Sequence, residues 1–119
     1  MGRPGQSDEI PLQHQLVIEP FEHWALEFVG PFHPTSNQKA YILVAMDYVT
    51  KWVEIIDLPR ATEEAVINFL FGLFLWYVLP REVITDGGNQ FTGNKVTATL
   101  RNHHITHRIT SPCHLQANG

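Results

Sequence analysis

The chain has very little cysteine and comparatively few basic residues. Cys113 is its only cysteine, so no disulfide can form within the chain and no Cys-x-x-Cys zinc site exists. This composition fits a reducing, intracellular setting. Eight Lys and Arg residues stand against twelve Asp and Glu residues, which gives a formal net charge of −4. That balance excludes the strongly basic profile of a dedicated DNA-binding module, although a bound metal can still supply local positive charge.

Long apolar runs are also missing. The longest apolar stretch, residues 65–79, is interrupted by Asn68 and is too short to span a bilayer. The N-terminal letters MGRPGQSDEIPLQHQ lack the apolar segment of a secretory signal. We therefore expect no membrane partner. The 119 residues, 44% of them hydrophobic and 17% charged, suit one small folded domain.

Hydrophobic patterning predicts an α/β domain. Residues 1–19 are rich in Gly, Pro and polar side chains without a regular period, and they are predicted to form an extended lead-in to a domain over 20–119. The predicted elements are strands 24–29, 40–50 and 51–59, a helix over 61–79, a strand 81–85, a helix 91–102 and a strand 105–110. Three antiparallel strands followed by alternating helices and strands predict a mixed five-stranded sheet with helices packed on it.

The first predicted helix has clear boundary signals. Thr62 is a suitable N-cap, and two glutamates follow in the first turn, where they favour the helix dipole. Apolar residues then recur at helical spacing, and Pro80 is expected to stop the helix. The aromatic residues of this segment are expected to lie in the core; they are Phe69, Phe71, Phe74, Trp76 and Tyr77.

Two carboxylates stand where chemistry could use them. Glu27 lies inside the apolar run HWALEFVGP, and a buried charge is costly unless it is paired or coordinates a metal. Asp86 follows the predicted strand 81–85 directly. If the first and fourth strands are neighbours, the two carboxylates could face each other and hold magnesium or manganese.

Each of these residues also has a plainer interpretation. Asp-Gly is a common turn dipeptide, so Asp86 alone is more often a turn former. Glu27 could be the solvent-facing half of an edge strand. His103, His104 and His107 straddle a helix end and a strand start, so we do not expect them to bind a metal together.

Several segments, in this order, resemble the catalytic core of retroviral-type integrases: WALEFVGP, YILVAMDYVTKWVE, REVITDGGNQF and ITHRITSPCHLQANG. The likeness runs from about Pro20 to Gly119 and is closest to integrases of gypsy-class long-terminal-repeat retrotransposons, especially those of plants. It implies a ribonuclease H-like fold. It also implies magnesium-dependent (or manganese-dependent) DNA 3′-end processing and strand transfer by an Asp, Asp, Glu triad, with DNA as partner, a homodimer, and a nuclear location.

The resemblance assigns catalytic and metal-binding roles to two residues of this chain. Glu27 takes the position of the family's first Asp, and Asp86 that of the second. The family's Glu would follow Gly119, on a helix that we expect to be missing here, and the family's zinc segment would precede Met1, so no zinc is expected. Glu in place of Asp moves the carboxylate by on the order of 1 Å, roughly one C–C bond. Magnesium tolerates such misplacement poorly, so we expect weakened metal binding and little or no activity.

Nucleic-acid contacts are expected near the same loops. The resemblance points to Gln90 and Asn118, while charge alone suggests Lys51, Lys95, Arg101 and Arg108 as phosphate contacts. Alternative interpretations stay open: a non-catalytic nucleic-acid-binding module, a protein-interaction module, or a retroelement relic without selected function.

Overall fold

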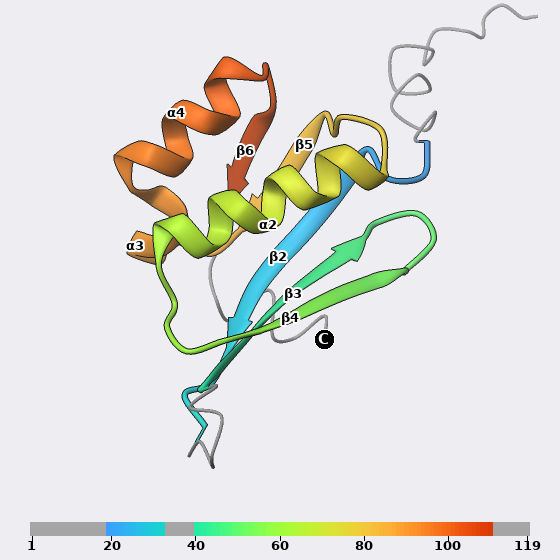
Figure 1. Cartoon of the computed structure of the whole chain (residues 1–119). Coiled ribbons are helices and arrows are strands. Elements are labelled where there is room, and N and C mark those ends of the chain that lie inside the picture. The colour runs from blue at the N-terminus through green and yellow to red at the C-terminus, as the bar shows by residue number, and fades with distance from the viewer. Residues whose placement is uncertain (1–18, 33–39, 111–119) are drawn as a thin grey trace, which may run out of the picture.

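The computed structural model describes residues 19–32 and 40–110 (Figure 1). Nearly all of the predicted lead-in, residues 1–19, therefore lies outside the described residues. The elements in chain order are β2 (His23–Val29), β3 (Tyr41–Asp47), β4 (Val53–Leu58), α2 (Glu63–Trp76), β5 (Glu82–Thr85), α3 (Asn89–Thr92), α4 (Asn94–Asn102) and β6 (Thr106–Ile109).

The five strands form one mixed sheet with the order β4-β3-β2-β5-β6. The pairs β3–β4 and β2–β3 are antiparallel, whereas β2–β5 and β5–β6 are parallel. The helices α2 and α4 provide the crossovers that parallel neighbours require. The predicted mixed sheet is thereby confirmed, and β2 is its central strand.

The described helices cover one face of this sheet (Figure 1). Trp24 and Leu26 alternate along β2 and are fully buried in a core cluster that includes Leu70 of α2. Phe28 continues the same alternation and meets Phe91 of α3, with 5.3 Å between ring centroids. The alternate side chains of each strand, including Glu27, therefore belong to the opposite face. Among the described residues, no helix is long and apolar enough to cross a bilayer.

Helix α2 begins as the sequence predicts but ends earlier. The Thr62 hydroxyl accepts a hydrogen bond from the Ala65 N–H at 3.1 Å, which confirms the N-cap. The helix ends at Trp76, not beside Pro80, because the Tyr77 backbone is extended and its hydroxyl donates to Glu54 of β4. The expectation of an all-core aromatic stripe is wrong for Trp76 and Phe71, which are 83% and 42% exposed, because neither side chain packs against the core cluster.

The predicted helix over 91–102 is two helices that meet at Gly93. The Gly93 backbone is extended, and a Cβ there would overlap the carboxylate of Glu63. That carboxylate accepts hydrogen bonds from the N–H groups of Lys95 and Val96, at 3.0 and 3.1 Å. Since Gly93 has no side chain to cap α4, the first residue of α2 supplies the cap.

Candidate metal and nucleic-acid site

The pairing of β2 with β5 brings together the segments that carry Glu27 and Asp86. The parallel pair β2–β5 matches His23 with Glu82 and Ala25 with Ile84. The pairing stops there, and the chain continues to Glu27 within β2 and to Asp86 in the turn directly after β5. Paired residues of neighbouring strands project from the same side of a sheet. Glu27 therefore belongs to the face opposite α2, and Asp86 follows the end of the neighbouring strand, because the first and fourth predicted strands are adjacent in the sheet.

Glu27 occupies a half-buried position in the middle of the sheet. Its partner in the antiparallel pairing is Val44 of β3, and β5 lies on the other side of β2. The edge-strand interpretation is therefore wrong, because β4 and β6 form the two edges. Because Glu27 is only half-buried, its carboxylate keeps access to solvent and to a bound cation.

Asp86 is held in a tight turn directly after β5. Its Oδ1 accepts a hydrogen bond from the Gly88 N–H at 2.8 Å, so the turn-former interpretation correctly describes its local geometry. A Cβ on Gly88 would lie 3.1 Å from Asp86 Oδ1 and 3.0 Å from Gln90 Nε2. The Gln90 amide and the Asp86 carboxylate thus both lie close to Gly88 in this turn.

The donor set suits a hard divalent cation but supplies only part of a coordination shell. Carboxylate oxygens are the ligands that magnesium and manganese prefer, and magnesium is often held by one or two carboxylates together with water and substrate phosphate. Within residues 19–32 and 40–110, no group of three or more His, Cys, Asp or Glu side chains could hold a metal. Glu27 and Asp86 therefore fit as two ligands of a site that substrate oxygens would help to complete.

The predicted basic contacts are spread over the molecule. Lys95 of α4 pairs with Glu64 at 2.6 Å, and Lys51 lies over the Tyr48 ring in the β3–β4 turn. Arg101 is in the last turn of α4. Arg108 shares the face of Glu27, but its guanidinium binds Glu82 at 2.7 Å. Asn118 lies outside the described residues.

The three histidines do not form one cluster. His103 Nδ1 is 2.8 Å from the Thr99 carbonyl oxygen, and its ring packs on Phe71 and Phe74. His107 Nε2 is instead 2.7 Å from the Thr85 hydroxyl, on β5. Sequence reasoning missed this contact, because no spacing along the chain indicates it.

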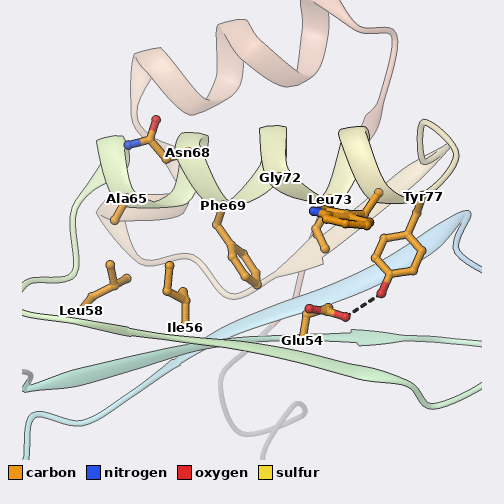
Figure 2. Close-up of a pocket in the computed structure, with 10 residues that line it drawn as sticks. Glu54, Ile56, Leu58, Ala65, Asn68, Phe69, Gly72, Leu73 and Tyr77 are labelled. Carbon is orange, nitrogen blue, oxygen red and sulfur yellow. Dashed lines mark hydrogen bonds between the residues drawn. The ribbon is translucent and has the colours of Figure 1, made fainter.

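A separate apolar groove lies between α2 and β4 (Figure 2). It has a volume of about 300 Å³. At one end the Glu54 carboxylate accepts hydrogen bonds from the Tyr77 hydroxyl at 2.5 Å and the Trp52 Nε1–H at 2.6 Å. The Tyr77 hydrogen bond, followed by that of Trp52, lowers the pKa of Glu54. The other lining residues are Ile56, Leu58, Ala65, Asn68, Phe69, Gly72, Leu73 and Trp76.

Comparison with known proteins agrees with this architecture. The family model described as "Integrase core domain" matches residues 18–114. The chain is 30% identical over 82 residues to "Gypsy retrotransposon integrase-like protein 1" of Macaca fascicularis, a match that covers 68% of this chain and 16% of that protein. It is 33% identical over 82 residues to the Gag-Pol polyprotein of avian reticuloendotheliosis virus, covering 68% of this chain and 7% of the polyprotein.

A solved structure shares the fold. The catalytic core domain of BIV integrase aligns with a TM-score of 0.66 and 21% identity, over 76% of this chain and 55% of that one. The sheet order described above is thus that of the ribonuclease H-like fold. The chain spans less than a fifth of the length of these curated relatives. Because the family model covers most of its residues, the chain belongs to the integrase core domain family.

Proposed function

We propose that this domain binds a divalent metal through Glu27 and Asp86 and uses it to hold a phosphate at a DNA end, as part of integrase-type DNA processing and strand transfer. The observation that carries the proposal is the parallel pairing of β2 with β5, which puts Glu27 on the central strand and Asp86 directly after its neighbour. Members of the family generally depend on a divalent metal and bind DNA. Nuclear location follows from the same chemistry and is part of the proposal.

Each residue of the site has a distinct task in this proposal. A divalent metal, when bound, supplies positive charge beside a phosphodiester oxygen. Asp86 presents its second oxygen, because Oδ1 is already held by the Gly88 N–H. Gln90, whose amide lies in the same turn, would offer a donor for a phosphate or base. Glu27 reaches about one bond further than an aspartate would. We therefore expect metal-assisted DNA binding and little or no strand transfer in magnesium.

The proposal is tested by measuring how strongly the chain binds a fluorescently labelled blunt DNA duplex, with magnesium or with EDTA. Magnesium should raise the affinity by about tenfold, the effect of one charge-assisted contact. Asp86→Asn should abolish this increment. Asp57→Asn is the matched control, since Asp57 is exposed on the same face as Glu27, two strands away, and should leave the increment unchanged. Equal affinity with magnesium and with EDTA would contradict the proposal.

We further propose that the domain forms a homodimer, as members of the family often do. Leu75 and Trp76 at the end of α2 are 85% and 83% exposed. Trp76 also borders the apolar groove beside β4. A protruding aromatic side chain and an apolar groove on the same helix allow two copies to exchange contacts around a two-fold axis.

A further inference from the structure

A chain of side-chain hydrogen bonds connects β6 with the residue that follows β5. His107 Nε2 lies 2.7 Å from Thr85 Oγ1, and the Thr85 hydroxyl donates to the Asp86 carbonyl oxygen at 2.8 Å. A threonine hydroxyl has a single proton. A carbonyl oxygen can only accept, so we assign the hydroxyl proton to the Asp86 carbonyl, and the hydroxyl then accepts from His107. The imidazole therefore carries its proton on Nε2.

This chain lies on the side of the sheet away from Glu27. His107 is paired with Val83 and Thr85 with Ile109, so both belong to the alternate set of side chains that faces the helices. Thr85 is 1% exposed. Burial lowers the pKa of His107, which favours the neutral imidazole with its single N–H. Neither residue is placed to meet a metal or DNA directly.

The backbone at Asp86 needs such support because the strand ladder ends one residue earlier. The Thr85 carbonyl still accepts from the Thr110 N–H at 2.8 Å, but the pairing of β5 with β6 stops there. The Asp86 carbonyl is instead held by the Thr85 hydroxyl, and its carboxylate by the Gly88 N–H. These two bonds fix the peptide plane after Asp86 and the direction of its side chain.

We propose that His107 is a positioning residue that orients the Asp86 carboxylate through the Thr85 hydroxyl. The inference rests on the proposed function, in which Asp86 is a metal ligand. Groups that orient ligands from behind typically change metal affinity by about 10- to 100-fold when they are removed. The hydrogen bond to the Asp86 backbone is the only described route by which His107 reaches the site.

Three substitutions in the full chain separate this role from packing. His107→Leu removes the N–H, whereas His107→Gln retains a side-chain N–H donor. Thr85→Val removes the hydroxyl and keeps the shape of the side chain. The first readout is amide hydrogen exchange by NMR at Gly88, whose N–H reports the orientation of the Asp86 carboxylate without any metal. The second readout is the dissociation constant for Mn²⁺.

His107→Leu and Thr85→Val should each speed Gly88 exchange by about tenfold and weaken Mn²⁺ binding by about tenfold or more. His107→Gln should restore both to within about twofold, and the double variant His107→Leu/Thr85→Val should resemble either single variant. If His107 only packed against its neighbours, His107→Leu and His107→Gln would change the two readouts equally, or Gly88 exchange would not change at all. Either result overturns the inference. If the wild-type chain binds no Mn²⁺, the proposed function fails, but Gly88 exchange still decides the role of His107.

Discussion

Position 27 combines a favourable place with an unusual side chain. Glu27 lies on the central strand, beside the strand that leads into Asp86, yet its side chain is one methylene longer than the aspartate that the family resemblance expects. Magnesium requires near-ideal octahedral geometry, so a shift of on the order of 1 Å matters more for its chemistry than for electrostatic attraction. At the scale of single residues, we therefore expect Glu27 to impair catalytic turnover more than it impairs metal binding.

The burial of His107 predicts how the stability of the folded chain depends on pH. Burial lowers its pKa below the ordinary value of 6.5, so the unfolded chain takes up this proton before the folded chain as the pH falls. The stability that the neutral imidazole contributes is complete above about pH 6.5 and decreases as the pH falls from there towards the folded-state pKa. Urea unfolding at pH 7.5 and pH 5.5 should show a larger loss for the wild type than for His107→Gln. An equal loss of unfolding free energy in the two proteins would contradict this prediction.

At the scale of elements, the junction between α2 and α4 depends on one carboxylate. Glu63→Ala leaves the N–H groups of Lys95 and Val96 without their acceptor, and it should lower the free energy of unfolding by about 1–2 kcal/mol. Gly93→Ala should cost a similar amount, because its Cβ displaces the same carboxylate. The double variant should cost clearly less than the two effects added together.

Glu64→Ala is the matched control for that prediction. Glu64 is adjacent to Glu63 but makes an exposed ion pair with Lys95, and such pairs contribute little to stability. Thermal or denaturant unfolding of the wild type and the four variants checks the prediction. It would be contradicted if Glu64→Ala destabilised the chain as much as Glu63→Ala, or if the Glu63 and Gly93 effects were additive.

The same junction shows which parts of the fold are readable from the sequence. The strands and α2 follow local hydrophobic patterns in the sequence, and Thr62 correctly predicts where α2 begins. The break at Gly93 could not be predicted, because its cause is a carboxylate on another helix, 30 residues earlier in the chain. Tyr77 likewise leaves α2 for a partner on β4, so tertiary contacts set both helix ends.

The candidate site also has parts that the sequence predicts and parts that it does not. Glu27 and Asp86 could be proposed from their place in apolar segments and from the family motifs. Their proximity could not be predicted, because it depends on the pairing of two strands that lie about 60 residues apart in the chain. The bond between His107 and Thr85 joins different strands diagonally, so no periodicity of the sequence encodes it.

At the scale of the whole molecule, the exposed end of α2 predicts self-association. Trp76→Ser removes a large apolar side chain that is 83% exposed, so the folded monomer should lose little stability while the dimer weakens. Sedimentation velocity over a range of protein concentrations measures this effect. A wild-type chain that stays monomeric throughout, or a Trp76→Ser variant that dimerises as strongly as the wild type, would contradict the proposed homodimer.

The central claim is that Glu27 and Asp86 together bind one divalent metal, and Mn²⁺ binding followed by electron paramagnetic resonance tests it most directly. We expect one bound Mn²⁺ per wild-type chain, with binding lost in Asp86→Asn and Glu27→Gln and unchanged in Asp57→Asn. Glu27→Asp should bind Mn²⁺ at least as tightly as the wild type, because an aspartate is the residue that the family resemblance expects at this position. Equal Mn²⁺ affinity in the wild type and in Asp86→Asn would contradict the claim.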